Sequence, residues 1–164
     1  MVRTLIRSLA VVLVTTLVQP VPAELIDDSL SPRQQLNLDF DWKDPLYSGT
    51  GTDNNFTAVV AHAYNVETRL NTAKYLGQRA RIFLGLPINV RGLRNPDSLR
   101  MSWTTNGLFS DGSVTPGNRQ LIYQGTISED VMRDNFNFTF DMDGRDLNQT
   151  LRLEPVYEIE IDTP

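Results

Sequence analysis

The chain has 164 residues, no cysteine, one histidine and a formal net charge of −5. The absence of cysteine excludes disulfides and thiolate metal ligands, and the single histidine excludes a histidine zinc cluster. The acidic balance argues against general nucleic-acid binding, because that function needs a net basic surface. A chain of about 150 residues can bury roughly 70% of its unfolded surface, so we expect one domain without covalent cross-links.

Residues 1–23 have the three-part pattern of a secretory signal peptide. Arg3 and Arg7 form a positive start, an apolar run over 9–18 follows, and Val21-Pro22-Ala23 is a cleavage pattern. The apolar run is shorter than the ~20 residues that span a bilayer, so we expect cleavage after Ala23 rather than an anchor. Removal of 23 of the 164 residues leaves 141, and the loss of two arginines changes the net charge from −5 to −7. We therefore predict a secreted or periplasmic protein with no transmembrane segment after signal cleavage.

Residues 24–55 are predicted to form a loose acidic segment that contains one strand. The strand is indicated by alternation of apolar and polar residues over 36–42, and Asp44-Pro45 and a run rich in glycine and asparagine end it. The first ten or so mature residues are expected to be loose.

Residues 56–76 fit two periodicities. Val59, Ala63, Val66 and Leu70 have the spacing of one helix face, whereas alternate residues from Phe56 onwards fit a strand. The abundance of β-formers favours one or two strands over 56–70, followed by a short helical turn over 72–76 that Gly77 ends. The sequence alone leaves the choice between strand and helix open.

The rest of the chain alternates more clearly. Strands are predicted over 79–86, where Pro87 ends the strand, and over 99–104, 120–127 and 157–161. Ser128 is placed to cap a single helical turn. The stretch 135–153 predicts a β-hairpin around Asp143-Gly144, with three phenylalanines on its inner row. The alternative for that stretch, a calcium loop, is disfavoured because Thr139 and Thr150 stand where carboxylates are needed.

These elements predict an all-β fold. We expect a single antiparallel β-sandwich, immunoglobulin-like or jelly-roll-like, over residues 56–164, with at most one or two short helical turns. The chain is compatible with exported immunoglobulin-like sandwiches, including pilus subunits, although no family motif matches residue by residue.

The charges are unevenly distributed along the chain. Residues 69–100 carry seven basic residues against Asp97 alone, whereas residues 101–164 carry eleven acidic residues against four basic ones. Such segregation could steer an acidic partner or a second subunit. We favour the alternative that the basic strand lies beside acidic strands within the same fold.

A candidate interaction surface consists of Leu108, Phe109, Trp42 and Tyr47. Leu108 and Phe109 lie in a long turn-rich loop over 104–119, where an exposed apolar pair would mark a partner site. The alternative, that the pair covers the end of the core, is equally open. Trp42 and Tyr47 are aromatic residues near carboxylates, a combination that sugar sites use.

No catalytic, cofactor or metal site is predicted. His62 is the sole histidine, and no nucleophile-elbow or nucleotide-binding motif occurs. The carboxylate pairs could serve a glycosidase, but pairs on the wet face of a strand look the same. These pairs are Asp27 with Asp28, Asp39 with Asp41, and Glu158 with Glu160.

The sequence therefore favours an exported non-enzymatic interaction or structural protein of the periplasm or cell surface, such as a subunit or accessory of a surface assembly. Its expected partner is a protein or a second copy of the chain, engaged for example by edge-strand pairing, with a glycan as a further ligand class. The alternatives are a carbohydrate-binding module and a small carboxylate-dependent glycoside hydrolase.

Overall fold

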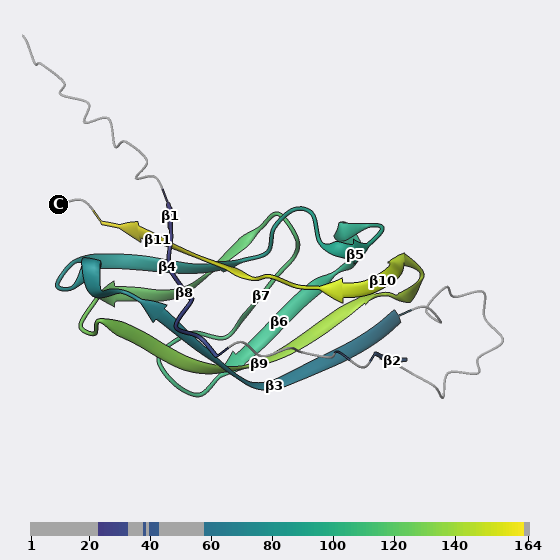
Figure 1. Ribbon diagram of the computed structural model, residues 1–164, viewed down its shortest axis with the longest axis horizontal. Helices are drawn as coiled ribbons and strands as arrows, with labels where there is room; N and C mark the ends of the chain where they lie inside the picture. Colours follow the sequence, from purple (N-terminus) through teal and green to yellow (C-terminus); the bar gives the residue numbers. More distant parts are fainter. Residues whose placement is uncertain (1–22, 33–37, 39, 43–57, 163–164) are drawn as a thin grey trace, which may run out of the picture.

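The computed structural model describes residues 23–32, 38, 40–42 and 58–162, which form two stacked antiparallel sheets and a small third sheet (Figure 1). The four-stranded sheet has the spatial order β1 (Glu24–Leu25), β11 (Val156–Ile161), β4 (Arg79–Gly85) and β8 (Arg119–Thr126). The five-stranded sheet has the order β2 (Asp41–Trp42), β3 (Ala58–Asn71), β9 (Val131–Asp143), β6 (Arg100–Thr105) and β7 (Gly112–Val114). The third sheet pairs β10 (Leu147–Arg152) with β5 (Arg91–Leu93) at one end of the sandwich.

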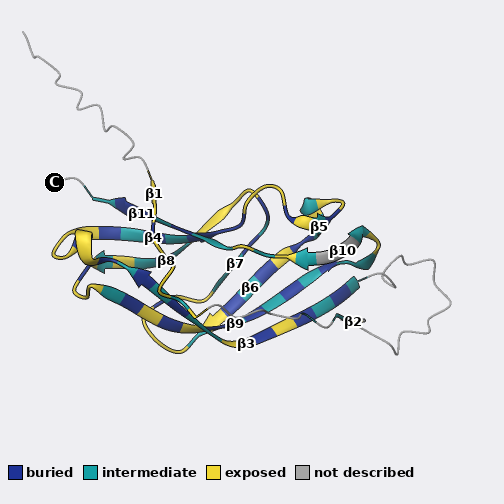
Figure 2. Ribbon diagram, viewed as in Figure 1, coloured by how far each residue is buried: buried dark blue, intermediate teal, exposed yellow. Residues whose placement is uncertain are grey.

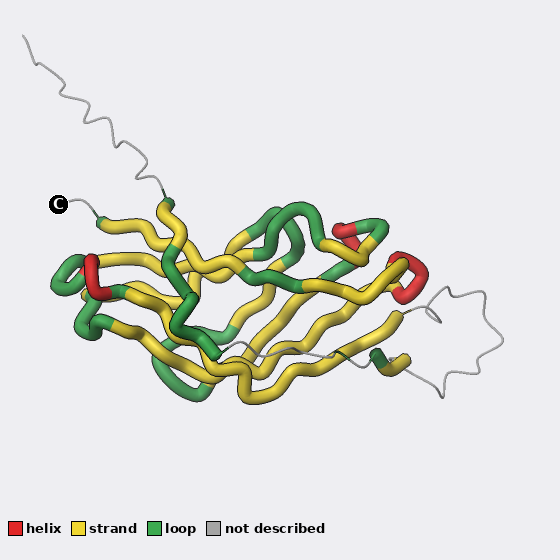
Figure 3. The backbone as a smooth tube through the Cα atoms, viewed as in Figure 1, coloured by secondary structure: helices red, strands yellow, loops and turns green. Residues whose placement is uncertain are grey.

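Helical structure among the described residues is limited to three short 3₁₀ turns (Figure 3). They are η2 (Ala73–Tyr75), η3 (Pro96–Ser98) and η4 (Gly144–Asp146). The predicted all-β sandwich is confirmed, with one turn more than the two expected at most. No helix in this part of the chain has the length and apolarity needed to cross a bilayer.

The turn predicted over 72–76 is η2, and Gly77 follows it with a φ of 77°. The turn predicted after Ser128 is wrong, because residues 127–129 form no regular structure, Asp130 is a bend and β9 begins at Val131. Thr72 holds this segment in place: its backbone N–H donates to the carbonyl of Asp130 at 2.8 Å, and its hydroxyl donates to the carbonyl of Glu129 at 2.7 Å. These bonds replace the helical ones that a capped turn would need.

The hydrophobic core lies between the inner faces of the two large sheets (Figure 2). On β9 the inward row contains Phe136, Phe138 and Phe140, each at most 3% exposed, with successive ring centroids 5.3 and 6.0 Å apart. The four-stranded sheet contributes aliphatic side chains to the core that are at most 1% exposed: Ala80, Ile82, Leu84, Ile122 and Ile159. The inner row of three phenylalanines predicted from the sequence is confirmed.

The ambiguous stretch 56–76 contains one long strand, β3, followed by η2. Its inward row changes parity at a β-bulge between Ala63 and Val66, which face Phe138 and Phe136 of β9. Before the bulge the odd residues point inward, and after it the even residues do. This one-residue insertion imitates the spacing of a helix face, because an inward residue is followed by one three positions later.

The hairpin predicted over 135–153 is only partly correct. β9 ends at Asp143 and η4 turns the chain, but the return strand β10 pairs with β5 and not with β9. Both edges of β9 are occupied over 136–141, because β3 pairs with it over 131–143 and β6 pairs with it on the other side over 136–141.

The start of the predicted mature chain is not loose. β1 pairs with β11, Ile26 is 6% exposed, and its N–H donates to the carbonyl of Tyr157 at 2.8 Å. The segment also lines the edge of β3, since the hydroxyl of Ser31 accepts a bond from the N–H of Arg69 at 2.8 Å. Of the strand predicted over 36–42, the structure describes 38 and 40–42, and Asp41–Trp42 form β2.

We therefore expect Ile26→Ala to lower the free energy of unfolding by about 2–4 kcal/mol, because it removes a buried side chain from the core. Leu25, its neighbour, is 65% exposed, so Leu25→Ala should change that free energy by less than about 0.5 kcal/mol. Urea denaturation of the two variants checks this difference. Equal losses would show that the segment does not dock through Ile26.

The uneven charges of the sequence meet on the outer face of the four-stranded sheet. Glu160 of β11 accepts hydrogen bonds or ion pairs from Arg81 of β4 at 3.0 Å and from Arg119 of β8 at 2.5 Å. Arg119 also contacts Glu158 at 2.8 Å, and its guanidinium lies 4.2 Å from the ring centroid of Phe83. The preferred interpretation is confirmed for these strands: opposite charges pair within the fold, so the segregation gives no reason to invoke a charged partner.

Candidate functional site

The outer face of the five-stranded sheet carries ordered rows of polar side chains. Strand register places His62, Thr139 and Ser102 in one row across β3, β9 and β6, and places Asn137 opposite Thr104 in the next row. Cross-strand neighbours on one face lie close enough to contact a common ligand. We use the name outer face for nine residues: His62, Tyr64, Asn65, Glu67, Ser102, Thr104, Asn135, Asn137 and Thr139.

The bulge in β3 presents two consecutive side chains where a regular strand would present one. Tyr64 and Asn65 together oppose Asn137, and the backbone N–H of Asn65 donates to the Oδ1 atom of Asn137 at 3.0 Å. Asn65 has a φ of 58°, a left-handed conformation that asparagine adopts more readily than most residues. The bond orients the Asn137 side chain through its amide oxygen, and the NH₂ group of that side chain takes no part in it.

Tyr64 projects from the bulge and is 70% exposed. The ring of His62 lies nearly parallel to it, with an interplanar angle of 15° and centroids 5.6 Å apart. His62 is itself oriented by a 3.1 Å hydrogen bond between Nδ1 and the hydroxyl of Thr139. The two rings form a supported aromatic platform on the surface.

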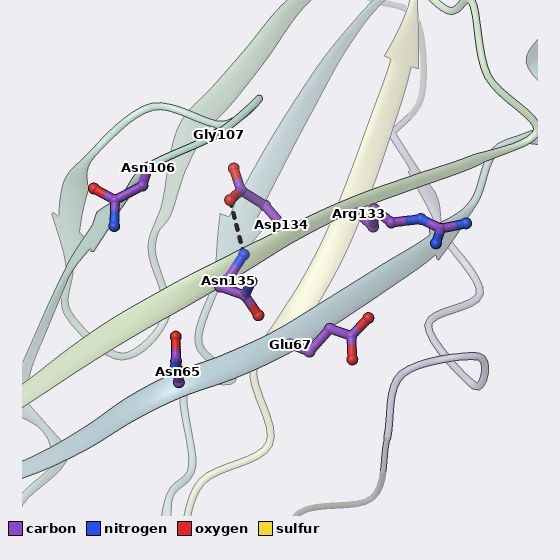
Figure 4. Close-up of a pocket in the computed structure, with 7 residues that line it drawn as sticks. All are labelled: Asn65, Glu67, Asn106, Gly107, Arg133, Asp134 and Asn135. Atoms are coloured by element: carbon purple, nitrogen blue, oxygen red, sulfur yellow. Dashed lines mark hydrogen bonds between the residues drawn. The ribbon is translucent and has the colours of Figure 1, made fainter.

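A cavity of about 290 Å³ is lined in part by Asn65, the residue that follows Tyr64 in the chain (Figure 4). β3 contributes two of its lining residues, β9 contributes three and the loop after β6 contributes two. The lining residues, which we call the polar pocket, are Asn65, Glu67, Asn106, Gly107, Arg133, Asp134 and Asn135. Three of the seven are asparagines and three are charged, and each asparagine amide offers both donors and an acceptor to a ligand.

Asp134 anchors the loop that forms one wall of the polar pocket. It occupies an inward position of β9 and is 9% exposed, and its carboxylate accepts the N–H of Phe109 at 2.8 Å and the N–H of Asn135 at 2.7 Å. The loop backbone comes so near that a Cβ atom on Gly107 would lie 2.6 Å from an Asp134 oxygen. A buried carboxylate needs such partners, because burial of an unpaired neutral polar group costs roughly 2–7 kcal/mol and burial of an unpaired charge costs more.

Glu67 is the ionised group at the opposite wall. Its hydrogen bond from Arg69 Nε, 2.7 Å long, lowers the pKa of this carboxyl, and the charges of Arg69 and Arg133 act in the same direction against desolvation. A carboxyl with a lowered pKa stays ionised at neutral pH and does not supply a proton as a general acid. Glu67 therefore fits the role of a hydrogen-bond acceptor.

The structure divides the four residues of the sequence-predicted interaction surface. Leu108 is 44% exposed at the border of the polar pocket, whereas Phe109 is 5% exposed and packs on Phe136 with ring centroids 5.8 Å apart. Phe109 is therefore corrected from a surface residue to a core residue, drawn inward by its bond to Asp134. Trp42 contributes its backbone to β2, its side chain lies outside the described residues, and Tyr47 lies outside them as well.

The carboxylate pairs named from the sequence do not form a cleft among the described residues. Glu158 and Glu160 form ion pairs with arginines within the four-stranded sheet, and Asp27 accepts the N–H of Ser29 at 2.9 Å. Asp39 lies outside the described residues, so its pairing with Asp41 has no structural counterpart. The group around Asp143 is occupied by the side chain and backbone of Arg145, and no cluster of metal-ligating residues occurs in the described part of the chain.

Sequence reasoning missed the platform and the polar pocket. The signal was present in the break of alternation at Tyr64-Asn65, where two polar-facing residues follow each other inside a strand pattern. Asparagine at that break is a residue that tolerates the positive φ of a bulge. No family model, curated protein or solved structure matches this chain.

Proposed function

We propose that the protein is an exported, non-enzymatic interaction protein of the periplasm or cell surface that binds its ligand through the outer face and the polar pocket. The observation that carries this proposal is the aromatic platform of Tyr64 and His62 next to a cavity lined by three asparagines and three charged residues. Binding sites characteristically combine an aromatic surface with a few convergent polar groups. Export is supported by the signal pattern of residues 1–23 in the sequence.

The sheet edges are less suited to binding than the outer face. β1 covers the edge of β11, β2 covers β3 at Val59 and Val60, and the 27–31 segment covers β3 again at Arg69 and Asn71. On β8, the carbonyl of Ile122 already accepts the N–H of Ser110 at 2.8 Å. Short or covered edge strands are a known protection against pairing with another chain, so these contacts favour the outer face as the binding surface.

The chemistry of the polar pocket supports binding rather than turnover. Its acids are engaged in different ways: Asp134 accepts two backbone N–H groups, and Glu67 accepts from Arg69. A hydrolytic pair needs one carboxyl that holds a proton and one that is free to act on the substrate or on water. His62, the single histidine of the chain, stacks on Tyr64 and forms a hydrogen bond with Thr139, so it supports the platform.

An NMR experiment tests the proposal. The ¹⁵N-labelled protein is purified from the exported fraction, where its mass should correspond to a chain that starts at Glu24, and is titrated with an envelope extract of its source organism. We expect chemical-shift changes at residues 62–67, 104–107 and 133–139. No covalent change in the extract should accompany them.

Two results would overturn the proposal. One is the absence of shift changes, or their restriction to β4, β8 and β11. The other is turnover of an extract component, such as the release of reducing sugar ends, that disappears when Glu67 is replaced by Gln. If only export failed, the proposed location would be wrong. The binding role of the outer face would still be tested by the chemical-shift changes.

A further inference from the structure

Resting on the proposed function, we infer that the ligand of the outer face is an uncharged oligosaccharide, with one sugar ring stacked on Tyr64 and its neighbour in the polar pocket. The aromatic platform is the first reason. An aromatic ring has an electron-rich face, and the C–H groups on one side of a sugar ring form a flat, slightly positive surface that matches it. Tyr64 offers such a face because it is 70% exposed and is supported by His62.

The second reason is the type of hydrogen-bonding group around the platform. The row beside Tyr64 contains Asn65, Asn137 and Thr104, and the next row brings Asn135 opposite Glu67. Amide side chains both donate and accept, so one amide can bind two neighbouring hydroxyls of a sugar. Glu67 adds an acceptor whose ionised form the guanidinium of Arg69 stabilises.

The third reason is that the site is formed in advance of binding. Asn65 is fixed by the bulge, its N–H orients Asn137, and the 3.1 Å bond to Thr139 orients His62. Groups held in place before binding lose little conformational entropy when the ligand arrives. A weakly hydrophobic ligand with many hydroxyls depends on this saving, because it gains little from burial of apolar surface.

The same surface is poorly suited to other ligands. A protein partner binds best through several apolar or aromatic anchors, but Tyr64 is the one large hydrophobic side chain exposed on the outer face as the structure describes it, with Leu108 at the border. A nucleic acid or an acidic glycan would need several cations, and the polar pocket holds Arg133 beside the carboxylates of Glu67 and Asp134. Hydroxyl-rich uncharged ligands fit this balance.

The inference is tested by binding of the exported protein to an array of defined neutral and acidic oligosaccharides, followed by titration calorimetry with the strongest neutral hit. Tyr64→Ala should weaken binding at least about fivefold through loss of the stacked ring, whereas Tyr64→Phe should stay within about threefold. Asn65→Gly keeps the positive φ and removes only the side chain, so it should weaken binding while unfolding stays unchanged. Ile88→Ala, at a residue 69% exposed outside the outer face, is the matched control and should bind as the original protein does.

Absence of any neutral hit overturns the inference, and so does a neutral hit that Tyr64→Ala binds with unchanged affinity. Preference for acidic glycans that depends on Arg133 also overturns it. The proposed function is judged separately: if the envelope extract shifts the outer-face amides and protease treatment of the extract abolishes those shifts, the face binds a protein. The function then stands and the oligosaccharide does not.

Discussion

Phe136→Ala is expected to lower the free energy of unfolding by about 3–5 kcal/mol, the largest loss among single substitutions considered for this fold. The side chain is 0% exposed, and it lies 5.3 Å from the ring centroid of Phe138 and 5.8 Å from that of Phe109. Its removal opens a cavity between β3, β6 and the loop that carries Phe109. The total free energy of unfolding of a domain is about 5–15 kcal/mol, so this loss is a large fraction of it. Urea denaturation should therefore show a clearly lower midpoint for the variant.

Asn135→Ala is the matched control, because Asn135 is the preceding residue on β9 and is exposed on the other side of the sheet. Its cost should stay within about 0.5 kcal/mol. Phe136→Leu keeps most of the volume and should cost about 1 kcal/mol. If Asn135→Ala were as damaging as Phe136→Ala, the assignment of alternate residues of β9 to the core would fail.

The core of this fold was predictable where alternation is uninterrupted. Over most of β4, β6, β9 and β11 every second residue is apolar and buried, so most inward residues follow from the two-residue period. The exceptions are Phe83, an apolar residue that faces outward, and Asp134, a polar residue that faces inward. The pairing of strands was not predictable in the same way. β10 looks like the partner of β9 because Asp143-Gly144 joins them, but the edges of β9 are filled by β3 and β6, which come from elsewhere in the chain.

The candidate site was hidden from the sequence for a related reason. The alternation read from Phe56 onwards indicates a strand, but its even-numbered row faces inward only from Val66, because the bulge lets Tyr64 and Asn65 both face outward. The other members of the outer face are ordinary polar residues on the three strands β3, β6 and β9, and only strand register brings them together. Conversely, Phe109 looked like a surface anchor because its loop is rich in turn formers, and the acid that draws it inward is 25 residues away.

Asp134 is the site of the second substitution with a large expected effect on the free energy of unfolding. Asp134→Ala is expected to cost about 2–4 kcal/mol, because it leaves the N–H groups of Phe109 and Asn135 without their carboxylate acceptor in a largely buried place. Asp134→Asn should cost roughly half as much, since one amide oxygen remains to accept one bond. Glu129→Ala removes the same charge from an exposed side chain and should cost less than about 0.5 kcal/mol, which separates the lost bonds from the change in net charge.

Hydrogen exchange shows whether the loss arises in the loop. The indole N–H of Trp103 donates to the carbonyl of Ser110 at 3.0 Å, so this indole and the Phe109 amide both report on the segment that Asp134 holds. In Asp134→Ala both should exchange faster, whereas amides in the centre of β4 should change only as far as global stability does. Unchanged protection at the two reporters would mean that Asp134 does not anchor the loop. Because this loop also forms a wall of the polar pocket, we expect ligand binding and core packing to weaken together in this variant, which Asn65→Gly and Tyr64→Ala should separate.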